Sequence, residues 1–203
     1  GATISRTPQG NITGFDLYQN RVIVRHEDVV ALTIGQLALY DNDMDSDIPF
    51  DVESGKLTVS PETALFVWTG KTFAPGGNVT LSSGGSGAAY DGTLRLDDSS
   101  TFIAASGEVH SIGGSWVADS GSTFTPSSST VVFTATTSGK SITPQSSFNN
   151  VTLNGTGGGW TLGSAMTVAG DMSIVAGTLQ GTSSLTVQGG SLDGNGTLSL
   201  SGG

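Results

Sequence analysis

A repeat of 19 residues near the C-terminus constrains the fold of this chain more than any other feature. When residues 160–203 are shifted by 19 positions, apolar residues fall on one another: Met166 on Leu185, Val168 on Val187, and Trp160 on Leu179 and then Leu198. Each repeat contains short apolar–polar–apolar segments, which are typical of β-strands because alternate side chains of a strand share a face. Glycine, serine, asparagine and aspartate fill the intervals. Short strands at a fixed period of about 20 residues predict a β-solenoid with one coil per repeat.

The spacing inside the repeat predicts the shape of each coil. Apolar residues recur every six or seven positions: Trp160, Met166, Met172, Leu179, Leu185, Leu192 and Leu198. Three such steps make one coil with three faces, and each inward side chain then stacks on its counterpart at roughly the 4.8 Å strand spacing. A disordered Gly/Ser linker is the alternative interpretation, but a linker has no reason to keep apolar residues in register.

The same pattern, with looser spacing, extends upstream to Lys56. Leu57 and Val59 recur 22 positions later as Val79 and Leu81. The chain is therefore predicted to be all-β: a parallel β-helix, or β-solenoid, of about 19–22 residues per coil with an N-terminal cap. We expect residues 1–55 to form the cap or adaptor, with residues 56–203 forming about seven coils that continue in a longer parent chain. A strand is expected at residues 21–25, and a short helix competes at residues 29–40.

Charge and composition exclude several classes of function. The net charge is −10 with only seven Lys and Arg, which argues against a nucleic-acid partner. No apolar run approaches the roughly 18 residues of a membrane span, so membrane insertion is not expected. The chain has no cysteine, and a repeat stack needs no disulfides. After Lys140 the only charged residues are Asp171 and Asp193. A polar, nearly uncharged surface suits a structural rod or a surface that faces carbohydrate.

Six short segments share strand-and-turn patterns: residues 20–28 (NRVIVRHED), 45–50 (DSDIPF), 71–77 (KTFAPGG), 137–144 (TSGKSITP), 147–155 (SFNNVTLNG) and 160–162 (WTL). These segments resemble those of large, repetitive, adhesin-like bacterial surface proteins that carry tandem β-solenoid segments. The resemblance implies an extracellular, cell-surface location and a host cell, neighbouring cell or glycan as partner. It supplies no catalytic residues. End-to-end stacking with further repeats of the same chain is a further expectation.

An acidic string is the sharpest local signal for a site. Asp41, Asp43, Asp45 and Asp47 alternate along the chain. Calcium takes six to eight oxygen ligands, and a flexible loop of alternating carboxylates can supply them. The match to an EF-hand loop is partial, because its glycine and its final glutamate are missing. We therefore predict Ca²⁺ as a candidate ligand of these four residues, with a solvated acidic loop as the alternative.

Other acidic residues raise the question of catalysis. Asp97 and Asp98, with Asp91 and Glu108, are candidates for a carboxylate cluster on neighbouring coils, and a glycosidase needs two carboxylates at a defined separation. Adjacent residues of a strand point to opposite sides, however, so Asp97 and Asp98 fit a turn after residues 94–96 better.

Histidines and aromatic residues give weaker signals. His110 and Asp119 leave a Ser-His-Asp arrangement open, but serine is so abundant here that its presence carries no information. We assign no role to His110 or to His26. Trp68, Trp116, Trp160 and Tyr90 would stack on sugars if their rings faced outward; Trp160 fits the core, whereas Trp68 and Trp116 are ambiguous. Thr-x-Thr pieces are typical of ice-binding faces, but the motif does not recur on every coil.

The sequence thus predicts a structural and adhesive module without catalysis of its own, which spaces or displays binding surfaces outside a cell. The alternative is a polysaccharide-binding or polysaccharide-cleaving β-helix. Outward aromatic residues beside carboxylates in a groove would favour the alternative, and a smooth Ser/Thr surface would favour the rod.

Overall fold

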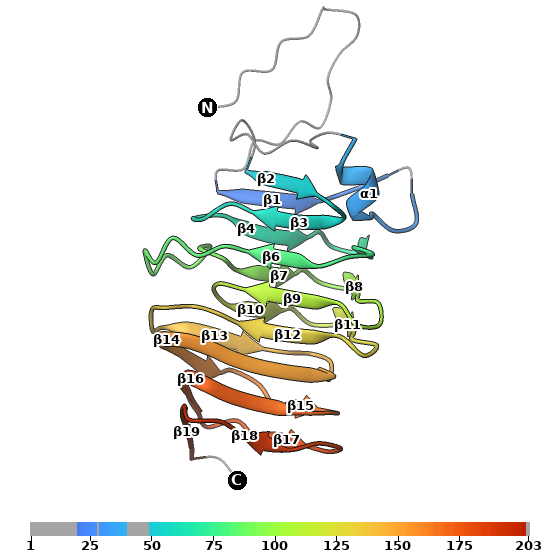
Figure 1. Ribbon diagram of the computed structural model, residues 1–203. Helices are drawn as coiled ribbons and strands as arrows, with labels where there is room; N and C mark the ends of the chain where they lie inside the picture. Colours follow the sequence, from blue (N-terminus) through green and yellow to red (C-terminus); the bar gives the residue numbers. More distant parts are fainter. Residues whose placement is uncertain (1–19, 28, 40–48, 202–203) are drawn as a thin grey trace, which may run out of the picture.

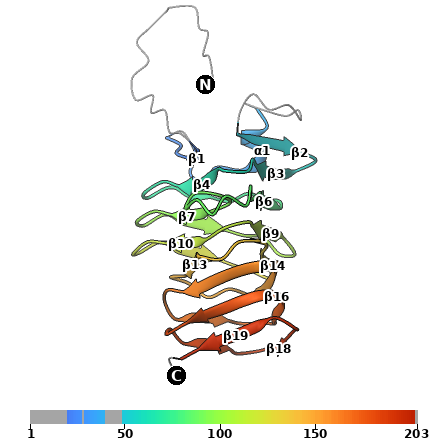
Figure 2. The ribbon, with the colours of Figure 1, turned by 90° about the vertical axis from the view of Figure 1, so that its left-hand side faces the viewer.

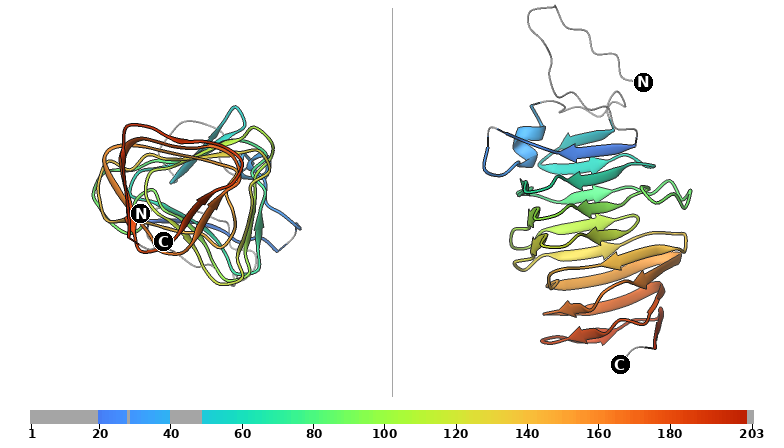
Figure 3. Two further views of the ribbon diagram at one scale, coloured as in Figure 1. Left: turned by 90° about the horizontal axis from the view of Figure 1, so that it is seen from below. Right: turned by 180° about the vertical axis from the view of Figure 1, so that it is seen from behind.

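The computed structural model describes residues 20–27, 29–39 and 49–201. These residues form a β-solenoid of about seven turns that is nearly all β, as predicted. The coils follow one another along a single axis, with β1 and β2 near one end and β19 at the other (Figure 1). Viewed along that axis, successive coils superimpose (Figure 3).

Each coil contributes a strand or a short bridge to each of three faces. The first face consists of β3 (Lys56–Val59), β6 (Val79–Leu81), β9 (Val109–Ile112), β12 (Thr130–Phe133), the beginnings of β14 (Asn150–Leu162) and β16 (Met172–Gly181), and β18 (Leu192–Asp193). The second face consists of β1 (Arg21–Val24), β4 (Ala64–Val67), β7 (Leu94–Leu96), β10 (Trp116–Ala118), β13 (Lys140–Thr143), the ends of β14 and β16, and β19 (Thr197–Leu200). The third face consists of β5 (Thr72–Phe73), β8 (Thr101–Ile103), β11 (Thr123–Thr125), β15 (Met166–Val168) and β17 (Leu185–Val187). Figure 2 shows β4, β7, β10 and β13 of the second face one below another.

The strand registers confirm the predicted repeat. In the parallel pairs, Met166 lies opposite Leu185, Val168 opposite Val187, and Leu57 opposite Val79. Trp160 pairs with Leu179, which in turn pairs with Leu198. Apolar residues 19 or 22 positions apart therefore stack directly on one another.

Coil length varies along the chain. In the first half, Leu65 pairs with Leu94, 29 positions further on, because a loop of residues 82–93 is inserted between β6 and β7. Trp116 pairs with Ile142, which is 26 positions away. After Lys140 the offsets on the second face shorten to 20 and then 19 positions. The looser spacing of the upstream sequence thus reflects insertions at corners, while the strands themselves stay aligned.

The beginning of the described chain closes the upper end of the stack. Strand β1 pairs in parallel with β4, and Leu32 forms a parallel bridge with Phe73. Helix α1 (Ile34–Leu37) begins at Thr33 with a capping box and buries Ile34 and Leu37. Strand β2 (Phe50–Glu53) pairs antiparallel with β3. Parallel pairing therefore reaches upstream of residue 55, and the domain boundary expected there stays a prediction.

Aromatic side chains fill the core of the upstream coils. Phe73, Phe102 and Phe124 occupy successive coils on the third face, with neighbouring ring centroids 5.5 Å and 5.6 Å apart. Trp116 packs from the second face against Phe124 and Phe148, with centroid distances of 4.9 Å and 5.0 Å. Such tilted and edge-to-face contacts are the arrangements that aromatic rings prefer.

Two strands differ from the short strands expected. Strands β14 and β16 are 13 and 10 residues long, and each continues from the first face around the corner to the second. Gly155 and Gly158 permit this bend, because a Cβ atom there would lie only 1.9 Å and 2.1 Å from the carbonyl oxygen of Ala135. Without side chains at the corner, adjacent coils approach closely and pairing resumes after a register shift.

Candidate functional site

A groove of about 350 Å³ runs along the second face across five coils. Its floor and one wall come from residues of β1, β4, β7, β10 and β13 and from the positions just before β7 and β10. The other wall is residues 87–90 of the inserted loop. The groove therefore exists only where the loop of residues 82–93 leaves the regular coil.

Short side chains form the floor. Ala64, Thr93, Ser115 and Ser141 occupy successive strands or strand ends below the loop, and the first three are almost fully buried. The Thr93 hydroxyl donates to the carbonyl oxygen of Ala89 at 2.8 Å, which ties the floor to the loop. The Ser115 hydroxyl oxygen accepts a hydrogen bond from the Ser141 amide at 3.0 Å. Small residues thus keep the channel open and line it with hydroxyl groups.

Asp91 holds the loop that forms the wall. Its fully buried carboxylate accepts four hydrogen bonds: from the amides of Glu62 (3.0 Å), Gly84 (2.7 Å) and Gly85 (3.1 Å) and from the hydroxyl of Ser83 (2.8 Å). Burial by itself raises the pKa of Asp91, but these hydrogen bonds and the charge of Lys140 together lower the pKa below its ordinary value. The carboxylate therefore stays ionised and acts as a structural clamp.

Lys140 closes one end of the groove. Its side chain is 2 % exposed, and its ammonium donates to the carbonyl oxygen of Ala88 at 3.2 Å. An ammonium has three donors, and in the described part of the chain Lys140 uses one of them, with no carboxylate within ion-pair distance. Donor capacity thus remains at a site from which water is largely excluded.

Arginine side chains flank an aromatic ring on the opposite wall. The guanidinium of Arg21 lies 5.0 Å from the ring centroid of Phe66, and that of Arg95 lies 5.9 Å from it. Such cation–π contacts orient the guanidinium groups.

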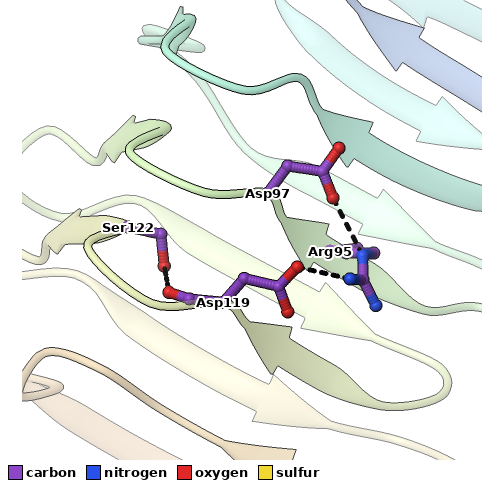
Figure 4. A network of polar contacts seen from close by, with 4 residues as sticks. All are labelled: Arg95, Asp97, Asp119 and Ser122. Atoms are coloured by element: carbon purple, nitrogen blue, oxygen red, sulfur yellow. Dashed lines mark hydrogen bonds and ion pairs between the residues drawn. The ribbon is translucent and has the colours of Figure 1, made fainter.

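Arg95 is also the centre of an ion-pair network (Figure 4). Its Nε donates to Asp97 Oδ1 at 2.8 Å, and its Nη2 donates to Asp119 on the next coil. Ser122 in turn donates to the carbonyl oxygen of Asp119 at 2.6 Å. Two carboxylates thus neutralise Arg95, whereas Arg21 has no carboxylate within ion-pair distance among the described residues.

The structure separates the carboxylates that were considered for catalysis. Asp91 lies at the corner before β7, Asp97 at the corner after β7, and Glu108 at the corner before β9. They therefore occupy three different corners of one coil. Asp97 and Asp98 also do not extend a strand, since a turn follows β7 directly. The structure therefore does not gather Asp91, Asp97 and Glu108 at one corner.

His110 points into the core, where it is 1 % exposed and its ring packs edge-on against Phe102. Its Nε2 lies 3.2 Å from Glu108 Oε2, but without hydrogen-bond geometry. Burial lowers the pKa of His110 to about 4 and raises the pKa of Glu108. Asp119 is held by Arg95, so the Ser-His-Asp arrangement left open by the sequence is not formed with this pair. His26 contacts the carbonyl oxygen of Thr72 at 2.9 Å through Nε2.

The predicted calcium ligands Asp41, Asp43, Asp45 and Asp47 lie outside the described residues, and Ca²⁺ binding by them stays a prediction. Within residues 20–27, 29–39 and 49–201, no group of three or more His, Asp or Glu side chains is placed to hold a metal ion.

Among the aromatic residues, Trp116 and Trp160 are core residues, whereas Tyr90 is 37 % exposed beside the groove. Trp68 lies under the guanidinium of Arg25, at 5.7 Å. The sequence shows only that Lys and Arg are few, and it does not reveal that Arg21, Arg95 and Lys140 share one groove. Knowing which strands pair would have shown that these three cations lie on strands of the same face.

The fold defines the class of protein: a β-solenoid with a loop-walled groove on one face. Comparisons with protein-family models, with curated proteins and with solved structures find no match to this chain. In the part of the chain that the structure describes, no helix is long and apolar enough to span a membrane.

Proposed function

We propose that this chain is an extracellular, cell-surface module with a structural and adhesive role and no catalysis of its own. The observation that carries the proposal is the continuous stack of about seven coils around one core. A stacked solenoid forms an elongated, stiff body suited to spacing or displaying binding surfaces.

The surface of the downstream coils supports the same role. From Ser141 onward the chain has no basic residue and only two acidic ones, and its outward positions are mainly Ser, Thr, Gln and Asn. Such a surface offers hydrogen bonds without strong charge, which suits a spacer.

A specific observation favours the second candidate, a polysaccharide-binding β-helix. The groove on the second face combines an outward aromatic ring, Tyr90, with hydroxyl groups and cationic side chains. Ligand sites commonly combine apolar surface with a few convergent polar groups in this way. Asp91, Asp97 and Glu108 give no support to a polysaccharide-cleaving β-helix, because they lie at separate corners of the coil.

A glycan array together with a reducing-sugar assay tests the proposal. We expect the intact chain to bind at least one class of glycan or cell-surface preparation and to release no reducing ends from it. Release of reducing ends in proportion to protein concentration would overturn the non-catalytic role. The absence of binding to any glycan or cell preparation would overturn the adhesive role.

A further inference from the structure

We propose that the groove on the second face binds an acidic saccharide, lying along the solenoid axis, through Lys140 and Arg21. This inference rests on the adhesive role proposed above and assigns the ligand class and the residues that recognise it.

The shape of the groove fits an extended chain. It crosses the five consecutive strands β1, β4, β7, β10 and β13 of the second face. At about 4.8 Å per strand, four spacings separate the strands of Arg21 and Lys140 by about 19 Å. An extended saccharide can lie along such a channel, and its length rather than its volume is the feature that suits a chain of linked rings.

The positions of the cations indicate a ligand with separated negative charges. Arg21 and Lys140 belong to the two end strands, and neither has a carboxylate within ion-pair distance in the described ranges, while at longer range the charge of Lys140 acts on the buried carboxylate of Asp91. Arg95, between them, is already paired with Asp97 and Asp119. A charge-assisted hydrogen bond from a nearly buried ammonium such as that of Lys140 is stronger than one formed in water.

The remaining lining suits sugar rings. Tyr90 presents a half-exposed aromatic ring on the loop wall. Ser115 and Ser141 supply hydroxyl groups on the floor. The Ser115 hydroxyl oxygen already accepts from a backbone amide, so its proton is directed toward another acceptor. Sugar hydroxyl oxygens are such acceptors.

The net negative charge of the chain still allows a short acidic ligand to bind in the groove. The chain carries a net charge of −10, which repels anions at long range. Beyond the Debye length of about 8 Å at physiological ionic strength this repulsion is screened. A short acidic saccharide can therefore place carboxylates at the two separated cations.

The test uses the intact chain with tetragalacturonic acid and its fully methyl-esterified form as probes, measured by isothermal titration calorimetry. We expect the acid to bind about ten-fold more tightly than the ester, because esterification removes the charge and keeps the rings. Lys140→Met and Arg21→Gln should each weaken binding of the acid by about three-fold, so that together they account for the ten-fold difference, and should leave the affinity for the ester unchanged. Tyr90→Ala should weaken both probes.

Lys56→Met, which removes an exposed cation on the first face, is the matched control and should leave the affinity for both probes unchanged. Because Lys140 is buried, thermal unfolding of Lys140→Met is measured in parallel, and the exposed Arg21→Gln keeps the proposal testable if that variant unfolds. Equal affinity for acid and ester, no binding of either probe, or equal losses in Lys56→Met would each overturn the proposal. Glycan binding on the array that survives Arg21→Gln and Tyr90→Ala would refute the groove while leaving the adhesive role intact.

Discussion

The coils between Lys56 and Phe148 enclose large aromatic side chains, whereas the coils after Trp160 enclose only aliphatic ones. The aromatic coils vary in length, with offsets of 22, 29 and 26 positions between paired residues. The aliphatic coils keep offsets of 19 to 22. The inward side chains of the two regions also differ in exposure. Leu192 and Leu198 in the last coil are 46 % and 41 % exposed, whereas Trp116 in the upstream core is 1 % exposed.

The difference between the two regions shows that a groove forms on a solenoid where a loop is inserted between strands. In the regular coils the corners are short turns or, in β14 and β16, continuous strand, and no long loop is inserted. In the upstream coils the insertion of residues 82–93 leaves the stack without disturbing strand register, and it forms one wall of the groove. The aromatic contacts beneath supply the burial that holds these irregular coils in place.

The largest expected effect tests whether the aromatic core is the main source of stability. Trp116→Ala should lower the free energy of unfolding by about 3–5 kcal/mol, because it empties a fully buried position between Phe124 and Phe148. The corresponding change in the last coil, Leu198→Ala, should cost less than about 1 kcal/mol, because that side chain is 41 % exposed. Urea denaturation measures both. Similar losses in the two variants would contradict the division into two regions.

Acid sensitivity should arise in the upstream region alone. The pKa of His110 is about 4 in the folded chain, below its ordinary value of 6.5, so folding favours the neutral ring. The resulting stabilisation is fully present above pH 6.5 and is lost as the pH falls through 4. It amounts to at most about 3.5 kcal/mol, at roughly 1.4 kcal/mol per pKa unit. His110→Val, which matches the paired Val79 and Val131, should flatten the stability profile over this range.

Glu108→Gln is the control for this prediction. Burial raises the pKa of Glu108, so its contribution has the opposite sign: it is present below the ordinary pKa of 4.5 and is lost as the pH rises. Glu108→Gln should therefore keep the acid sensitivity, as followed by urea denaturation at pH 4 to 8. A flat profile in Glu108→Gln, or an unchanged one in His110→Val, would show that His110 is not the group responsible.

A smaller effect is expected at the junction of the two regions. Gly155→Ala should destabilise the fold by about 1–3 kcal/mol, because its Cβ would lie 1.9 Å from the carbonyl oxygen of Ala135 and the two coils would have to separate. Gly70→Ala is the comparison, since there a Cβ meets nothing within 4 Å and only the positive φ of 68° is unfavourable, at about 1 kcal/mol. Thermal unfolding compares them, and an equal or smaller loss in Gly155→Ala would argue against close approach at this corner.

The smallest effect concerns the ion pairs of the upstream surface. Arg95→Gln should lower stability by only about 0.2–1 kcal/mol, because the side chain is 36 % exposed and solvent screens its pairs with Asp97 and Asp119. The loss should shrink further in 1 M salt, where the Debye length is about 3 Å. A loss that is large and independent of salt would mean that packing of the arginine on Phe66 outweighs its charge.

Much of the fold was predictable from residues whose side chains face inward. Met166, Leu185 and their partners alternate with polar residues at a fixed period, and the pairings follow from that pattern. The bend of β14 was not predictable, because its glycines also fit an ordinary turn. The groove was not predictable either: Arg21 and Lys140 are brought to one channel by coils of unequal length.

By itself, the sequence determined that apolar side chains spaced 19 or 22 positions apart stack into a three-faced solenoid. The stack is required because a single coil cannot bury its own apolar face. Only the tertiary structure decided that His110 lies in the core, that Asp91 clamps the inserted loop, and that Arg21 and Lys140 lie at the ends of one groove. The physical reason is that inward positions obey a local period, whereas contacts between outward side chains depend on the length of every loop between them.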